Sequence, residues 1–413
     1  MKNNHDDLKI YVIGTGFSSL TTVLYLLSKE IKPVVIDIAT NYSTETYNLP
    51  LLKPYFYKKR IENYSFFGGL SNVWKGVIQQ SSKTENDHQN LQHSNQLFKE
   101  IYSLLPNMYF FTNKEIKSNV YELRQIKNIE EVLEKLNLET SSVSEPIILS
   151  GKDNLCVPYK TSSIFQSLIE KKKIELITGE VISIGEENQT TILFYKQRKK
   201  IFKKKCKYVF CGAGALSSTS IIQNTLKISK KIKFESSNKH LFISIFKDKK
   251  KVNNSFPIYQ GKIIKNGYTT IYLQTYLLSQ LLDQSFKGWK KKIINFLCKI
   301  LPMKNLAISY VSTDSDNKNN NFFKLINNIN KEQNFFKVIP IGIKLPKFGG
   351  NHFGSSFDSN TKGNIKNIKN FSVIDTTTLS KIYCTPPTLT LLMHSLNITK
   401  KVLKELYPNN KIS

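Results

Sequence analysis

Two glycines and an acid near the start of the chain have the spacing of a dinucleotide site. Gly14-Thr15-Gly16 follows the apolar run Ile10 to Ile13, and Asp37 ends a second apolar run 23 positions after Gly14. Paired glycines allow a turn in which a ligand phosphate meets backbone amides, and an acid at this distance can accept from both ribose hydroxyls. Such an acid prefers a free 2′-hydroxyl, which favours FAD or NAD over NADP.

A helix must follow this turn for the site to bind a phosphate group. The spacing predicts that Ser19 opens it, with one apolar face made by Leu20, Val23, Leu24 and Leu27. The positive N-terminal end of such a helix favours an anion. Ser19 stands where a third glycine is common and is small enough for close helix–strand packing. An ordinary strand, turn and helix without a ligand is the alternative interpretation.

Two further glycine segments could approach a ligand closely. In Gly68-Gly69-Leu70-Ser71-Asn72, adjacent glycines let the backbone lie against a flat ligand, and Ser71 and Asn72 offer hydrogen bonds; alone, the segment could be just a turn. Gly212-Ala213-Gly214-Ala215 follows the apolar run Tyr208 to Cys211 and precedes an expected helix from Leu216 to about Asn224.

His352 is the candidate base. It sits among glycines and serines in Gly349-Gly350-Asn351-His352-Phe353-Gly354-Ser355, and not on an apolar helix face. A neutral imidazole near its ordinary pKa can take a proton from a ligand at neutral pH. A lone histidine is about as often structural as functional, so both readings stand at this point.

Composition limits the class of protein. The chain has 413 residues, enough for two or three domains, and five cysteines without metal-ligand spacing. This cysteine usage argues against a disulfide framework and fits a reducing compartment. No apolar run has the length of a membrane span, and the first residues lack the apolar core of a secretion signal. The sequence therefore predicts a cytoplasmic protein without a structural metal.

The formal net charge of +29 leaves alternatives open. Lysine clusters at 199–205, 230–233, 247–251 and 290–292 could bind nucleic acid or an anionic bilayer. Lysine dominates over arginine and no basic motif is interleaved with aromatics, so we expect a solvated basic surface and no nucleic acid. The amphipathic stretch 277–301 predicts a helix packed on its own sheet, with a weak peripheral membrane contact as the alternative.

The pattern along the rest of the chain predicts a mixed α/β protein. We expect Ser81 to Ser94 to be a mobile excursion, helical patterns within 95–137, and a helix from Ser163 to Lys172. Strands are expected at 174–177, 181–184, 191–195 and 208–211, the tight spacing indicating an antiparallel meander inserted into the nucleotide fold. Alternation within 234–276, with strands at 241–246 and 268–276, predicts a second antiparallel sheet, and a last helix should end near Leu406.

Four segments of the chain, in order, resemble the glucose-methanol-choline (GMC) family of FAD-dependent oxidoreductases, in a short, divergent bacterial branch. They are Gly14 to Asp37, Gly68 to Trp74, Tyr208 to Leu216, and Val373 to Thr378 with Pro387 to Thr390. The resemblance implies a Rossmann-like, three-layer FAD-binding domain with an antiparallel-sheet plus helix substrate domain. We place the FAD-binding domain at 1–80, 150–230 and 346–413, and the substrate or cap domain at 81–149 and 231–345.

The resemblance also implies roles for single residues. His352 would take the alcohol proton while a hydride passes from the carbinol carbon to the flavin, and Val181 would meet the adenine end. Asp375 and Thr388 would lie at the flavin end. The predicted cofactor-binding residues are therefore Gly14, Gly16, Ser19, Asp37, Gly69, Ser71, Asn72, Val181, Gly212, Asp375 and Thr388.

The function that this implies is oxidation of the CH–OH group of a polar alcohol or sugar, with a role in making surface polysaccharide. The sequence departs from the family where a second histidine or an asparagine often precedes the last proline turn, because Cys384-Thr385-Pro386-Pro387 stands there. Ser380 stands where a proline is common, and His394 on the last helix is interpreted as structural. The alternatives are a flavoprotein without alcohol oxidation, or a basic peripheral membrane or nucleotide-binding protein.

Overall fold

The structure is a computed structural model of the whole chain. It describes residues 8–38, 67–72, 76–78, 91–111, 141–144, 147–150, 158–229, 234–235, 238–246, 259–265, 268–277, 306–313, 335–341, 354–355, 363–379 and 385–408.

A five-stranded parallel sheet organises the chain. Its order is β19 (Phe371–Val373), β11 (Tyr208–Cys211), β1 (Ile10–Ile13), β2 (Val34–Asp37) and β7 (Glu175–Thr178). All residues of β1, β2, β11 and β19 are buried, as expected for strands covered on both faces. The sheet therefore brings together chain segments from both ends and the middle of the sequence.

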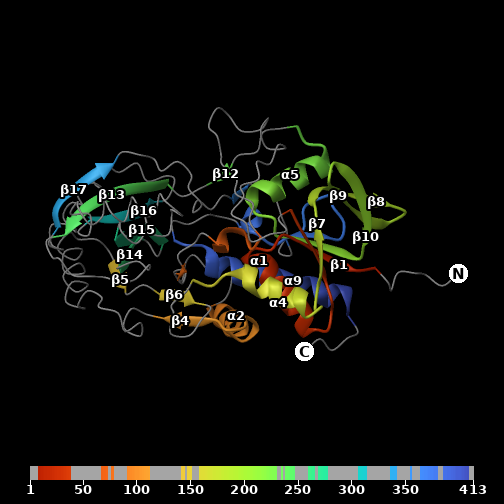
Figure 1. Cartoon of the computed structure of the whole chain (residues 1–413), viewed down its shortest axis with the longest axis horizontal. Helices are drawn as coiled ribbons and strands as arrows, with labels where there is room; N and C mark the ends of the chain where they lie inside the picture. The colour runs from red at the N-terminus through yellow and green to blue at the C-terminus, as the bar shows by residue number, and fades with distance from the viewer. Residues whose placement is uncertain are drawn as a thin grey trace.

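Alternate residues of these strands supply two separate cores. On one face, Ile10 and Val12 pack with helices α1 (Phe17–Ser28), α2 (Leu91–Leu104), α4 (Thr161–Glu170) and α9 (Thr388–Leu406). On the other face, Tyr11 and Ile13 pack with helix α5 (Ala215–Leu226) and a small antiparallel sheet. The result is a three-layer α/β domain, as predicted, and Figure 1 shows its helices gathered in one half of the molecule.

The small antiparallel sheet is a meander of β8 (Glu180–Glu187), β9 (Thr190–Gln197) and β10 (Lys200–Cys206). A meander was predicted here, and the predicted strands 181–184 and 191–195 lie in β8 and β9, but the predicted strands 174–177 and 208–211 were assigned to it wrongly. β7 and β11 belong to the parallel sheet, whereas β10 is the missing third strand of the meander. Six of its seven residues are exposed, so β10 has no apolar alternation and looks like a simple lysine cluster in the sequence.

A second, six-stranded antiparallel sheet occupies the other end of the molecule's long axis (Figure 1). Strands β13 and β15 confirm the predicted alternating strands, and β14 had not been predicted. The order is β17 (Phe335–Ile341), β13 (Asn238–Phe246), β16 (Leu306–Thr313), β15 (Tyr268–Leu277), β14 (Tyr259–Lys265) and β5 (Ser141–Ser144). The fold-class prediction is thus confirmed, while the exact domain boundaries stay a prediction.

Two smaller sheets complete the described strands. One pairs β12 (Phe234–Glu235) with β18 (Gly354–Ser355), and the other orders β3 (Val77–Ile78), β6 (Ile147–Ser150) and β4 (Tyr109–Phe111). Helix α2 begins at Leu91, so the last part of the expected excursion 81–94 is helical instead. The predicted helical patterns near 129–136 and at 278–301 lie outside the described residues.

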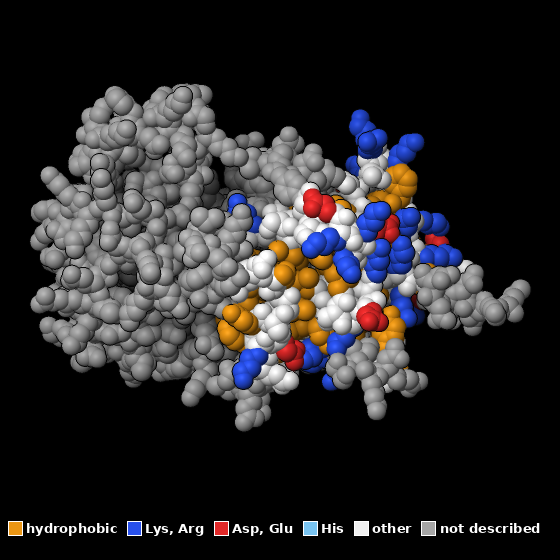
Figure 2. Space-filling view, turned by 60° about the horizontal axis from the view of Figure 1, so that its bottom comes forward, with side chains coloured by type: hydrophobic (Ala, Val, Ile, Leu, Met, Phe, Trp, Pro, Cys, Tyr) orange, Lys and Arg blue, Asp and Glu red, His pale blue; other side chains and the backbone are white. Residues whose placement is uncertain are grey.

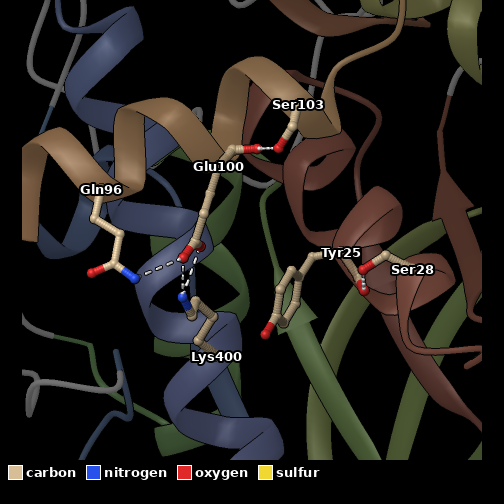
Figure 3. A network of polar contacts seen from close by, with 6 residues as sticks. All are labelled: Tyr25, Ser28, Gln96, Glu100, Ser103 and Lys400. Atoms are coloured by element: carbon tan, nitrogen blue, oxygen red, sulfur yellow. Dashed lines mark hydrogen bonds and ion pairs between the residues drawn. The ribbon is translucent and has the colours of Figure 1, made fainter. Parts of the chain in front are cut away.

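Polar contacts tie the helices of the first face to one another (Figure 3). Lys400 of α9 donates to both carboxylate oxygens of Glu100 on α2 at 2.7 Å. The Tyr25 ring of α1 lies beside this pair, and burial, followed by the Glu100 charge, raises the pKa of Tyr25. Deeper in the interface, the hydroxyls of Thr22 on α1 and Thr399 on α9 are 2.9 Å apart. These contacts fix α9, which carries one of the predicted ligand segments at its start.

Among the described helices, none is both long and apolar enough to cross a membrane.

Candidate cofactor-binding site

The first glycine turn leaves no room for a side chain at Gly14. Its φ is +92°, and a Cβ there would stand 2.6 Å from the carbonyl oxygen of Gly212. The Gly14 amide donates to the carbonyl of Ile36 at 2.8 Å, which ties the turn to the end of β2. Gly14 therefore allows the turns after β1 and β11 to lie against each other at the carboxyl edge of the sheet.

Gly16 has open space in front of it. It is the N-cap of α1, no side chain caps the helix there, and no acid lies in the first turn. A Cβ at Gly16 would meet no protein atom within 4 Å. Helix α1 thus begins at Phe17, two residues before the predicted start, and presents an uncapped positive end to an open space. This is the arrangement that an anionic group such as a pyrophosphate needs.

Thr15, for which the sequence pattern predicts no role, connects the acid to the second glycine loop. Its hydroxyl donates to Asp37 Oδ2 at 2.6 Å and accepts from the Gly68 amide at 2.7 Å. Thr15 is buried and Asp37 is only 8% exposed. One carboxylate oxygen of Asp37, the residue predicted to bind the ribose, therefore accepts a hydrogen bond from the protein itself, and this bond fixes the direction of the carboxylate.

The second glycine loop lies directly on the first. Gly68 and Gly69 both have positive φ, +92° and +56°, and a Cβ at Gly69 would stand 3.2 Å from the Gly16 Cα. The buried hydroxyl of Ser71, a predicted cofactor-binding residue, donates to the Gly68 carbonyl at 2.6 Å inside the loop. Asn72 ends the same 3₁₀ turn (η2, Gly69–Asn72), and its side chain lies outside the described residues.

Thr161, also missed from the sequence, joins the two loops to helix α4. Its buried hydroxyl lies 2.8 Å from the carbonyl oxygens of Thr15 and Gly68, and its amide donates to Ser71 Oγ at 3.1 Å. Thr161 is the first residue of α4. A run of Thr and Ser before an apolar helix is a signal for a helix start, and it could have located this residue.

Ser19 packs the first helix against the second glycine turn. Its hydroxyl lies 3.1 Å from the carbonyl of Ile13 and 3.4 Å from that of Gly212, and the side chain is fully buried. A Cβ at Gly212 would overlap this hydroxyl. The structure thus gives Ser19 and Gly212 a packing role between β1, α1 and β11, as the small size of Ser19 had suggested.

Asp375 sits where helix α5 begins. It accepts from the Gly214 amide at 2.8 Å, from the Ser218 hydroxyl at 2.5 Å, and from the Thr377 amide at 2.9 Å, the last as N-cap of the turn η5 (Thr376–Thr378). Burial raises the pKa of Asp375, against the effect of these hydrogen bonds. Asp375 therefore orders the second turn, where Gly214, with φ +85°, again faces open space.

The remaining predicted residues occupy separate places. Val181 is buried in β8 opposite Tyr195, next to a bulge. Thr388 is the buried first residue of α9. His352 lies outside the described residues.

His394 of α9 is engaged within the protein, as interpreted from the sequence. Its Nε2 lies 2.9 Å from Thr378 Oγ1. Burial, with a smaller contribution from Lys401, lowers the pKa of His394 to about 4, so the imidazole is neutral at neutral pH.

The four segments that resemble one family thus meet in space. Residues 14–19 touch 68–69 and 212, and the Ile374 amide donates to the Cys211 carbonyl at 2.9 Å. The uncapped start of α1 faces open space at Gly16. Gly214 also faces open space, but there the Asp375 carboxylate accepts from the N-cap amide of α5. These residues fit a dinucleotide with its pyrophosphate at α1 and its ribose near Asp37.

No protein-family model matches the chain. No curated protein matches it either. Among solved structures, the chain is similar to pyridoxine 4-oxidase from Mesorbium loti, a GMC-type FAD oxidoreductase. The match has a TM-score of 0.65 at 9% sequence identity and covers 96% of this chain and 99% of that chain. The chain therefore has the fold of GMC oxidoreductases along almost its whole length.

Proposed function

We propose that the chain is an FAD-dependent oxidoreductase acting on the CH–OH group of a polar alcohol or sugar. The observation that carries this proposal is the convergence of four distant segments around the open helix start at Gly16. A dinucleotide is the ligand whose pyrophosphate, ribose and ring system would use all four segments together. The fold supports FAD as that dinucleotide.

The described residues would bind and orient the cofactor. The first-turn amides of α1 would hold the pyrophosphate, since no acid and no side-chain cap compete for them. Asp37, turned by Thr15, would accept from the ribose hydroxyls. The loop at Gly68 and Gly69, which Thr161 anchors, would leave backbone close to the ligand. Bound FAD would supply the two-electron acceptor.

His352 is the base in this proposal, by the resemblance of its segment to the family. A base that removes the hydroxyl proton raises the hydride-donating power of the carbinol carbon. His394 is a poor candidate for this task, because its Nε2 is hydrogen-bonded to Thr378 and its pKa is lowered to about 4. A role in making surface polysaccharide belongs to the same proposal and depends on the substrate.

The experiment is anaerobic addition of sugars and alcohols to the purified yellow protein, followed by the flavin absorbance. Pyridoxine belongs in the panel, because the solved neighbour is named for its oxidation. We expect one polar alcohol to bleach the flavin, and His352→Ala to keep the flavin but lose most of the bleaching. Full bleaching in His352→Ala would reject the base.

One feature favours a second candidate, a flavoprotein that does not oxidise alcohols. The family often has a histidine or an asparagine just before the last proline turn, and this chain has Cys384-Thr385. Flavin that no alcohol bleaches, but that a chemical reductant does, would select this candidate.

A further inference from the structure

The turn between β9 and β10 carries two positive charges that its backbone conformation does not require. Arg198 and Lys199 have φ of +47° and +69°, and Gln197 pairs directly with Lys200, so the two residues form the whole turn. Glycine and asparagine are the residues that such a turn favours. The meander's other turn, Asn188 and Gln189, has the same backbone, with φ of +48° and +62°, and no charge. Local folding therefore gives no reason for two cations at this turn.

The charge continues from the turn into the neighbouring strands. We call residues 196–205 the basic hairpin; seven of these ten residues are Lys or Arg. Lys203 pairs with Glu187 at 3.0 Å, and Glu180 lies opposite Lys196 in the ladder. The other five make no ion pair with any residue in the described part of the chain: Arg198, Lys199, Lys200, Lys204 and Lys205. Figure 2 shows basic side chains gathered at this end of the molecule.

Apolar side chains lie within the same basic hairpin. Ile201 is 67% exposed and Phe202 is 40% exposed, two of the three large exposed hydrophobic residues in the described part of the chain. Ile201 is the second residue of β10 and lies three positions after Arg198 of the charged turn. A surface that offers cations for phosphate groups and an aliphatic group for the acyl boundary matches the interface of an anionic bilayer.

Nucleic acid fits this surface less well. Binding of single strands uses several aromatic rings, whereas Phe202 is the one aromatic residue of the basic hairpin and one face of its ring is stacked on Tyr195, with centroids 5.5 Å apart. Arg198 is the one arginine among the seven cations, so bidentate contacts to phosphates or bases are few. Lysine-rich point charges beside an exposed isoleucine suit a lipid headgroup layer better.

We propose that the basic hairpin docks on an anionic lipid surface, with the five cations that make no ion pair within the described residues at the phosphates and Ile201 in the interface. Contact of this kind is reversible and weakens as salt rises. It does not depend on the flavin chemistry proposed above, because the hairpin lies on β9 and β10 and not at the glycine turns.

The test is co-sedimentation of the full-length protein with phosphatidylcholine vesicles that contain about one-third phosphatidylglycerol, at physiological salt. Pure phosphatidylcholine vesicles are the lipid control. The variant Arg198→Asn with Lys199→Gly removes two charges and installs the favoured turn residues, so it should fold at least as well as the parent. We expect it to lose about 25-fold in vesicle partition, from about fivefold per cation.

A matched variant separates charge from backbone. Gln189→Gly installs Asn-Gly in the other turn of the meander without changing charge, and should bind vesicles like the parent. Ile201→Ser keeps every charge and should reduce partition severalfold. Equal partition of parent and hairpin variant would overturn the proposal. So would a hairpin variant that aggregates more but binds equally, since the lysines would then only protect the edge strand β10. Loss of duplex DNA binding instead of vesicle binding would overturn it in favour of nucleic acid.

Discussion

At the scale of single residues, Thr15 has the largest predicted consequence for the site. Its hydroxyl satisfies the Gly68 amide and orients the Asp37 carboxylate, and all three groups are buried. Thr15→Val should lower the free energy of unfolding by about 1 to 3 kcal/mol, because it leaves a buried donor and a buried charge without this partner. It should also reduce the flavin bound per chain. Thr15→Ser, which keeps the hydroxyl, is the control. The measurements are the denaturant midpoint and the flavin absorbance per chain. A Thr15→Val variant that is as stable as the parent and binds as much flavin would contradict this role of the Thr15 hydroxyl.

His394 gives a prediction for pH. Its pKa is lowered to about 4 in the folded protein, while an unfolded histidine has a pKa of about 6.5. The unfolded chain therefore binds this proton first, and stability should fall as the pH drops from about 6.5 to 4. The full effect is on the order of 3 kcal/mol.

The measurement is the difference in unfolding free energy between the parent and His394→Gln across this range. The glutamine amide can still reach Thr378, so the variant should fold, but it has no proton to take up. We expect the difference to change with pH mainly between 6.5 and 4. A difference that stays constant there would show that His394 titrates normally.

Single residues also show how far the sequence could predict the site. The tight approach of the backbone at Gly14, Gly69 and Gly212 could be predicted, because it favours glycine, while the contact of these residues with the cofactor stays a prediction. Thr15 and Thr161 were missed, because their importance depends on hydrogen bonds between loops that lie far apart in sequence. The hydrogen bond from Ser71 to the Gly68 carbonyl could not be known from the sequence either, and the contact of Ser71 with the cofactor stays a prediction.

At the scale of elements, the contact between α2 and α9 is open to measurement. Lys400 and Glu100 form a close pair, with side chains 23% and 31% exposed. Partial exposure limits such a pair, so a double-mutant cycle of Lys400→Met and Glu100→Gln should give a coupling of about 0.5 to 1 kcal/mol. The coupling should shrink at high salt. Zero coupling at low salt would mean that the apolar contacts of α9 alone hold the helices together.

The elements that were predicted well are those with an apolar pattern of their own. Strands β1, β2 and β11 are wholly buried, and α9 has a continuous buried face, so the spacing of apolar residues in the sequence agrees with the observed burial. β10 was missed because an exposed edge strand of lysines has no such pattern. Of the four strands predicted for the meander, β7 and β11 were assigned wrongly because they are adjacent to it in sequence and pair elsewhere.

At the scale of the whole molecule, the account rests on one ligand that holds distant segments together. The parallel sheet, the two glycine turns and the last helix make sense jointly if a dinucleotide lies across the carboxyl edge of the sheet. The structural similarity to a GMC oxidoreductase covers 96% of the chain, so it includes the second, six-stranded sheet as well as the parallel sheet. The bound ligand itself is therefore the direct test of this account.

That test is the visible absorption spectrum of the purified protein, compared with Gly16→Val. The Gly16 backbone, with φ −72° and ψ −174°, is one that valine adopts readily, and the new side chain would meet no protein atom at its Cβ. The variant should therefore fold like the parent, as circular dichroism can check, yet lose its flavin bands because the side chain takes the place of the pyrophosphate. We expect a yellow parent and a folded, colourless variant. A parent that stays colourless when FAD is added, or a variant as yellow as the parent, would contradict the site.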